Sequence, residues 1–381
     1  MASSVTRPQV SRELLVNTTT CFIWAGVPLC LIGPPGATKS STVRAIAGAF
    51  GWLYRRKPLP GVTDAVLLSG LPGQDERNTK TKPYPWLQDL LDETAAKRRS
   101  ILCFEDAGEV SRAIQTALLE TLGDNELGGH ALPLTSMVAT ANPIGGGLQV
   151  TAAMANRIGH LRFTITPREH AALMRHDFPN PESPTFREDD GALVTLERGT
   201  IAAFLDTLQD FDTPDPDAQQ PGQAVGPYPS ARTWDLTARV FAAVAASDLS
   251  DEQKREVRIL AAKSLVGDVA ANAYFTWVQY PDMLRPADVV GNPNLVREKR
   301  DLFAPEKMDK AFIFLGALTR YVIATNTVQA WRAAWQVLGV FASQKCVPLC
   351  APYAVILKRR RPTDAPESVP EMAAFSEVFG R

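Results

Sequence analysis

The chain has 381 residues, 45% of them hydrophobic, and a formal net charge of −1. This length favours two or three domains with a sizeable core. The near-neutral charge gives no overall basic surplus for a polyanion, so a nucleic-acid partner is not indicated. No apolar run reaches the roughly 18 residues that a membrane-spanning helix needs, so we expect no membrane association.

The N-terminal stretch MASSVTRPQVSRELL lacks the apolar centre of a secretory signal. The five cysteines are an odd number and are scattered along the chain, which favours reduced thiols over a disulfide framework. Together these observations predict a cytoplasmic protein.

Residues 1–165 alternate short apolar runs with helical patterns. The predicted strands are 27–33, 65–71, 101–106, 136–142 and 159–165. The predicted helices are 38–50, 86–99, 110–122 and 151–157. Short strands that alternate with helices indicate a mostly parallel sheet covered on both faces. The sequence therefore predicts an α/β domain with a five-stranded parallel sheet over residues 1–165.

The character of the chain changes after this domain. Residues 166–229 include two stretches rich in Pro, Asp and Gln, which are typical of surface loops and linkers. Helical patterns dominate from Ser230 onward, with predicted helices at 233–247, 251–278, 309–325 and 328–343. We therefore expect a connecting region over 166–229, an all-α lid with a helical extension over 230–381, and a loose tail at the end.

The stretch GPPGATKSS follows the first predicted strand and leads into a helix. It comprises Gly33, Pro34, Pro35, Gly36, Ala37, Thr38, Lys39, Ser40 and Ser41. A phosphate-binding loop has this context, with Lys39 reaching the β- and γ-phosphates and the Ser40 hydroxyl ligating Mg²⁺. Thr38 replaces the usual second glycine; if its φ is positive, the strain costs roughly 1–2 kcal/mol, and otherwise little. The alternative is a plain Gly-Pro turn.

The predicted strand ILCFED ends in two carboxylates, Glu105 and Asp106. A phosphate-loop protein needs such a strand to support the metal and to polarise the attacking water. The usual order is Asp and then Glu, so here Glu105 would support the metal and Asp106 would be the base. A displacement of about 1 Å can cost about a hundredfold in rate, so the inverted order leaves the efficiency of hydrolysis in question. The alternative is an acidic pair that caps the following helix.

Three further polar residues stand near the ends of predicted elements. Asn142 ends a strand, where its amide would lie between the loop and the second carboxylate, although Asn-Pro is also a common turn. Arg157 ends a short helix and can act as an arginine finger or as a cation at a helix terminus. Arg232 lies in the first turn of a helix capped by Ser230, a position that disfavours a cation; this suggests a role such as contacting phosphate, and a plain surface arginine is the alternative.

In this order the motifs resemble those of an AAA+ ATPase of the MoxR-like branch. GPPGATKSS resembles Walker A, ILCFED Walker B, ATANP sensor 1, MANRIGHLRF the arginine-finger segment and YPSARTWD sensor 2. The resemblance implies a P-loop NTPase fold with a helical lid, ATP and Mg²⁺ as cofactors, and a homo-oligomeric ring, usually a hexamer. It also implies roles: Lys39 and Ser40 on phosphate and metal, Glu105 on metal, Asp106 as base, Asn142 as sensor, Arg157 as trans-acting finger and Arg232 as lid arginine.

Proteins of this branch act as chaperone-like remodellers and often work with a partner that carries a von Willebrand factor A domain. The leading hypothesis is therefore an ATP-driven remodelling ring. A nucleotide-gated scaffold with slow or no hydrolysis is the alternative, motivated by Thr38 and the inverted carboxylates. A P-loop kinase or a nucleic-acid motor is a third hypothesis, which the Asn142, Arg157 and Arg232 triplet and the neutral charge do not favour.

Overall fold

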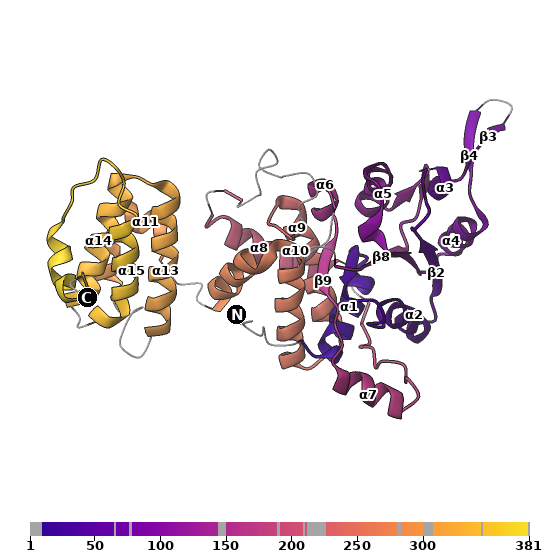
Figure 1. The fold of residues 1–381 in the computed structure, drawn as a ribbon, viewed down its shortest axis with the longest axis horizontal. Helices are drawn as coiled ribbons and strands as arrows, with labels where there is room; N and C mark the ends of the chain where they lie inside the picture. Colours follow the sequence, from indigo (N-terminus) through magenta and orange to yellow (C-terminus); the bar gives the residue numbers. More distant parts are fainter. Residues whose placement is uncertain are drawn as a thin grey trace, which may run out of the picture. The chain divides into compact units, whose positions relative to one another are not determined.

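The computed structural model describes residues 10–64, 66–75, 78–143, 150–188, 191–208, 210–211, 226–279, 284–299, 308–343 and 346–379. Residues 212–225, in the middle of the predicted connecting region, lie outside this part. The chain divides into two compact units, Met1–Tyr274 and Phe275–Arg381 (Figure 1). Within the described residues, no helix is both long enough and apolar enough to cross a bilayer.

The first unit is built on a five-stranded parallel sheet with the order β2-β5-β8-β1-β9. Its strands are β1 (Leu29–Ile32), β2 (Leu53–Pro58), β5 (Ser100–Glu105), β8 (Thr135–Ala141) and β9 (Gly159–Arg162). The chain order of the strands reverses beside β1, which lies between β8 and β9. In open α/β sheets, ligands bind outside the carboxyl ends of the strands at such a switch point. The sheet is that of a P-loop NTPase, as the sequence predicts.

Helices cover both faces of this sheet (Figure 1). They are α1 (Arg12–Ala25), α2 (Lys39–Phe50), α4 (Pro85–Ala95) and α5 (Arg112–Asp124). Successive strand residues point to opposite faces, and two residues of β8 show the result. The Ser136 hydroxyl donates to the Ile23 carbonyl of α1 at 2.7 Å. Met137 instead belongs to a buried cluster with Leu90 of α4 and Leu118 of α5.

The predicted strand 65–71 is wrong. Val66–Ser69 forms a short helix, α3, and Leu71 opens a hairpin of β3 (Leu71–Asp75) and β4 (Asn78–Lys82) outside the sheet (Figure 1). The second strand of the sheet is β2, with the sequence LYRRKP. Because β2 is an edge strand that water reaches, it tolerates three consecutive basic residues and lacks the apolar run that marks a buried strand.

The first unit also contains a short helix between β8 and β9 and the helices that follow the sheet. These are α6 (Ala152–Ala155), α7 (Pro167–Arg175), α8 (Ala192–Leu205), α9 (Ala231–Ala246) and most of α10 (Asp251–Gln279). The predicted connecting region thus contains α7 and α8. Helix α10 bends at Gly267, where φ is 84° and a Cβ would lie 2.8 Å from the Pro227 carbonyl oxygen, so glycine is required. The compact units meet at Tyr274 and Phe275, not at the predicted boundaries 165 and 229. The predicted division into nucleotide domain, connecting region and lid stays a prediction about function.

The second unit is helical. Its elements are the end of α10, α11 (Pro286–Gly291), α12 (Leu295–Glu298), α13 (Met308–Thr325), α14 (Val328–Ser343), α15 (Val347–Arg359), the 3₁₀ helix η5 (Pro370–Phe375) and α16 (Ser376–Phe379). Its core is rich in aromatic residues, and Trp335 meets Phe375 edge-on with ring centres 6.0 Å apart. The loose tail predicted from the sequence is therefore wrong, because the fully buried Phe375 fixes the end of the chain to α14.

Candidate functional site

The loop GPPGATKSS joins β1 to α2. Glycine is required at its start, because a Cβ on Gly33 would lie 1.9 Å from the Phe163 carbonyl oxygen. Thr38 has φ 62° and ψ 19°, in the left-handed region, and its hydroxyl oxygen is buried without a hydrogen-bond partner. The strained alternative for Thr38 is therefore the one that the structure shows.

The side chain of Lys39 is buried and folds back onto the loop. Its ammonium donates to the carbonyl of Gly33 at 2.6 Å, to the carbonyl of Pro34 at 2.9 Å and to Oδ1 of Asn142 at 3.3 Å. Burial lowers the pKa of Lys39, and the nearby negative charge of Asp106 opposes that shift. The ammonium is thus held at the carboxyl edge of the sheet by oxygens that phosphate oxygens can replace.

Asn142 bridges the loop and the second carboxylate. It follows β8 directly, and its Nδ2 donates to Oδ1 of Asp106 at 3.3 Å while its Oδ1 accepts from Lys39. Asp106 follows β5 and has a left-handed backbone, with φ 58°. Strain of this kind is concentrated at functional sites. The geometry places Asn142 between loop and carboxylate, where the sequence predicts it; its role as a sensor stays a prediction.

Glu105 has a different environment. Its Oε2 lies 3.6 Å from Nη1 of Arg56 on the neighbouring strand β2, and its side chain is only 17% exposed. The β2–β5 register pairs Pro58 with Glu105. The sequence analysis did not single out Arg56, because a basic residue in an unrecognised strand carries no signal of its own. Without a bound ligand, Glu105 is therefore paired with the cation Arg56, whereas Asp106 faces Lys39 and Asn142.

The residues at this edge fit a nucleotide with a divalent cation. Carboxylate and hydroxyl oxygens are the ligands that Mg²⁺ prefers, and Glu105 and Ser40 supply one of each. Within the described residues the Ser40 hydroxyl makes no hydrogen bond. The Ser41 hydroxyl, by contrast, donates to the Thr38 carbonyl in the first turn of its own helix at 2.9 Å. Of the two serines, Ser40 is therefore the one whose hydroxyl is available to a ligand.

The two predicted arginines lie close enough for their charges to act on each other. Burial lowers the pKa of Arg157, and the positive charge of Arg232 lowers it further, while Asp124 acts in the opposite direction. Nη1 of Arg157 donates to the Ala153 carbonyl at 2.9 Å, but its Nε is buried without a partner. Two guanidinium groups that repel each other form a site for an anion.

Hydrogen bonds between α6 and the segment before α9 hold this pair together. The Tyr228 hydroxyl donates to the Ala152 carbonyl at 3.0 Å, and the Ser230 hydroxyl donates to Oδ1 of Asn156 at 2.6 Å. Ser230 caps α9 as predicted, in a capping box with Thr233. Burial raises the pKa of Tyr228, and the positive charges of both arginines oppose this shift. Tyr228 opens the stretch YPSARTWD that resembles sensor 2, but no role for its side chain was predicted from the sequence.

The functional residues thus fall into two groups, which we name the lysine cluster (Lys39, Asn142 and Asp106) and the arginine pair (Arg157 and Arg232). Within the described part of the chain, no hydrogen bond or ion pair joins one group to the other.

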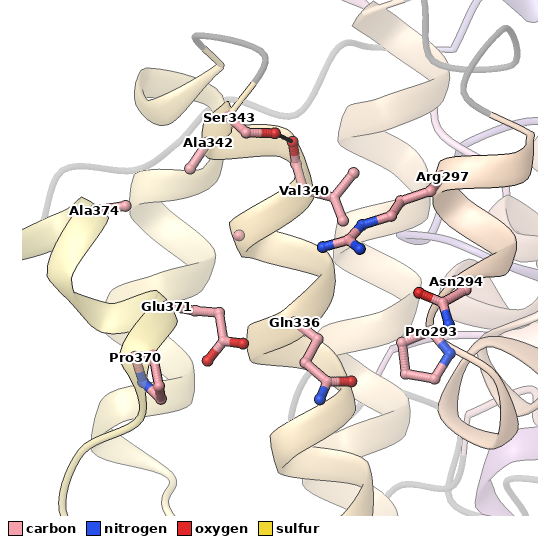
Figure 2. A pocket seen from close by; sticks show the side chains of 11 residues that line it. Pro293, Asn294, Arg297, Gln336, Val340, Ala342, Ser343, Pro370, Glu371 and Ala374 are labelled. Atoms are coloured by element: carbon pink, nitrogen blue, oxygen red, sulfur yellow. Dashed lines mark hydrogen bonds between the residues drawn. The ribbon is translucent and has the colours of Figure 1, made fainter.

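A separate hollow of about 640 Å³ lies in the second unit along α14 (Figure 2). The side chains of Arg297 and Glu371 point into it from opposite sides, and Gln336 lies between them (Figure 2). No ion pair joins Arg297 to Glu371 among the described residues. The hollow has one exposed cation and no group of residues arranged for catalysis, so we assign it no chemistry.

No family model matches the chain. It is 29% identical over 194 residues to the Lon protease of Azorhizobium caulinodans, a match that covers 46% of this chain and 22% of that one. It is 33% identical over 101 residues to Lon protease 1 of Hydrogenovibrio crunogenus, which covers 26% of this chain and 12% of that one. The chain therefore spans less than a quarter of the length of these relatives.

Among solved structures, the crystal structure of a candidate ATPase from Cytophaga hutchinsonii has 17% identity and a TM-score of 0.40, covering 68% of this chain and 82% of that one. The strand order, the phosphate loop and the Lon relatives together support an AAA+ type of nucleotide domain in this chain. The finer assignment to the MoxR-like branch has no such support.

Proposed function

We propose that the chain is an ATP-hydrolysing AAA+ ATPase of the MoxR type that assembles into a ring, most simply a hexamer, and remodels a partner protein in the cytoplasm. The observation that carries the proposal is the convergence of Lys39, Asn142 and Asp106 at the carboxyl edge of the sheet. The client is a partner protein or complex, and a protein with a von Willebrand factor A domain is the partner to test first.

In this proposal Lys39 exchanges the loop carbonyls for the β- and γ-phosphate oxygens of ATP. Ser40 and Glu105 would hold Mg²⁺, which when bound neutralises the charge that develops on the phosphates. Asn142 orients the attacking water, and Asp106 takes its proton. Electrostatic stabilisation by groups already in position accounts for most of the rate of phosphoryl transfer.

The arginine pair completes the site from outside. Since no hydrogen bond or ion pair among the described residues links it to the lysine cluster of its own chain, we place it against the nucleotide of the neighbouring subunit. There the guanidinium groups would bind the γ-phosphate, which removes their mutual repulsion. The resemblance implies this role in trans for Arg157 and a lid role for Arg232. The interaction of their charges leads us to extend the role in trans to both residues.

The test measures Mg²⁺-dependent ATP hydrolysis against protein concentration. We expect turnover per subunit to rise as the ring assembles, and both Lys39→Ala and Asp106→Asn to abolish it. Arg55→Ala is the matched control. Arg55 forms a 2.8 Å ion pair with Asp89 of α4 and makes no hydrogen bond to the lysine cluster among the described residues. Absence of nucleotide binding by wild-type protein would refute the proposal.

A nucleotide-gated scaffold is the second candidate, favoured by the ion pair of Glu105 with Arg56 and by the shorter Asp106 in the position of the base. It predicts measurable ATP binding and assembly with turnover no higher than that of Asp106→Asn. The double change Glu105→Asp with Asp106→Glu would then raise the rate. If turnover of the double variant does not rise, the inverted order is not the cause of slow hydrolysis.

A further inference from the structure

A surface groove lies beside the end of β2, between the segment that follows this strand and the start of α4. We call it the β2 groove. Its hollow has a volume of about 530 Å³, which is in the range of known ligand sites. The rings of Tyr84 and Trp86 and the side chains of Pro60, Leu67 and Pro85 make its walls largely apolar.

Lys57 is the charged residue of the groove. Its ammonium lies 5.2 Å from the ring centre of Trp86 and 6.0 Å from that of Tyr84, close enough for a cation–π contact. Burial among these groups lowers the pKa of Lys57. Of the three consecutive basic residues of β2, Arg55 and Arg56 have carboxylate partners, whereas no carboxylate among the described residues pairs with Lys57. The groove thus contains a cation without a counter-ion.

Two further features indicate the chemistry of an occupant. The apolar wall continues onto the surface, where Val66, Leu67 and Leu71 are 36%, 39% and 54% exposed. Helix α4 begins at the groove with Pro85, has no acidic residue in its first turn, and has no side-chain cap at Tyr84. The positive end of its dipole therefore adds to the charge of Lys57. The groove is complementary to an occupant that is apolar along its length and carries a negative charge.

We propose that the β2 groove docks an extended segment of a partner protein in which an Asp or Glu is flanked by apolar residues or prolines. The carboxylate pairs with Lys57, and the flanking residues pack on Tyr84 and Trp86, as prolines do in other aromatic grooves. A nucleic acid is a poorer fit, because a single cation with apolar walls neutralises little phosphate charge. The docking goes beyond the proposed function and does not require ATP hydrolysis.

The test selects random 12-residue peptides by display on the immobilised full chain. We expect recovered peptides to share an acidic residue next to apolar residues or prolines. A labelled synthetic copy of the best peptide should bind wild-type protein and the Arg55→Gln control equally by fluorescence anisotropy. It should bind Lys57→Gln about tenfold more weakly. Replacing the acidic residue of the peptide by the matching amide should weaken its binding to wild-type protein by the same factor.

Leu67→Ser provides a second variant at an exposed position and should also weaken binding, with an unchanged thermal midpoint to show that the fold is kept. The proposal is overturned if no peptide is enriched, if the enriched peptides lack a carboxylate, or if they bind Lys57→Gln as well as wild type. Tighter binding of a labelled dT oligonucleotide, lost in Lys57→Gln, would overturn it in favour of a nucleic-acid site.

Discussion

The lysine cluster and the arginine pair are both cationic, but their environments are opposite. The Lys39 ammonium has three oxygen acceptors within 3.3 Å. Arg157 has one bond to a backbone carbonyl, a buried Nε without a partner, and a second guanidinium beside it. An unpaired buried donor is costly, and a neighbouring like charge adds to that cost. The lysine cluster is therefore satisfied within one chain, whereas the arginine pair requires an anion from outside.

The largest expected effect comes from removing Arg157. In assembled protein Arg157→Ala should lower ATP turnover about a thousandfold, the size typical of an arginine finger. Stability without nucleotide should stay the same or rise slightly, because the repulsion with Arg232 is lost. Turnover and the denaturation midpoint of the same preparation are the two measurements.

Mixed rings make this comparison sharper. Arg157→Ala subunits retain the lysine cluster, and Asp106→Asn subunits retain the arginine pair. Mixing the two inactive proteins should restore part of the activity if the pair acts on a neighbour. If unmixed Arg157→Ala hydrolyses ATP at the wild-type rate, or if mixing restores nothing, the pair does not act in trans.

The next largest effect concerns His160, which contacts the helix that precedes Arg157. His160 on β9 is buried, and its Nε2 lies 3.2 Å from the carbonyl of Ala155 in α6, two residues before Arg157. Burial lowers the pKa of His160 to about 4. In the unfolded chain His160 is protonated near pH 6.5, whereas in the folded chain it is protonated only near pH 4. The contribution of His160 to the free energy of unfolding is therefore constant above pH 6.5 and falls by about 3 kcal/mol towards pH 4.

Urea unfolding at pH 7.5 and pH 5 measures the part of this loss that occurs above pH 5, about 2 kcal/mol. His160→Gln keeps a side-chain donor for Ala155 but cannot titrate, so its stability should change less between the two pH values. An equal loss in wild type and His160→Gln would show that other groups cause the acid sensitivity.

Physical chemistry explains which of these features the sequence predicts. Local patterns sufficed for the strands at the centre of the sheet, because burial on both faces requires apolar runs. They also sufficed for the loop, because its turn into a helix requires glycine. β2 escaped prediction because an edge strand needs no apolar run. The charge interaction of Arg157 with Arg232 and the ion pair of Glu105 with Arg56 join residues far apart in sequence. Only the three-dimensional packing of α6 against the segment before α9, and of β2 against β5, creates them.

Thr38 is the strained member of the loop that positions the lysine cluster. Thr38→Gly removes a β-branched residue from the left-handed region and a buried hydroxyl without a partner, at the cost of greater backbone freedom in the unfolded chain. We expect the variant to be about 1 kcal/mol more stable, with tighter ATP binding. Chemical denaturation and nucleotide titration measure both. A less stable variant would show that the Thr38 hydroxyl has a role that outweighs the strain.

The smallest expected effect concerns Glu105. Its ion pair with Arg56 is long, and Arg56 is 54% exposed, so the pair is a weak one. Because Arg56 competes with a cation for the same carboxylate, Arg56→Ala should raise the affinity of the ATP-bound protein for Mn²⁺ about threefold. Arg55→Ala is the control, since it breaks only the ion pair with Asp89. The spectroscopic signal of bound Mn²⁺ gives the affinity without reference to turnover. Equal affinities of the two variants would contradict the proposed competition between Arg56 and the metal for Glu105.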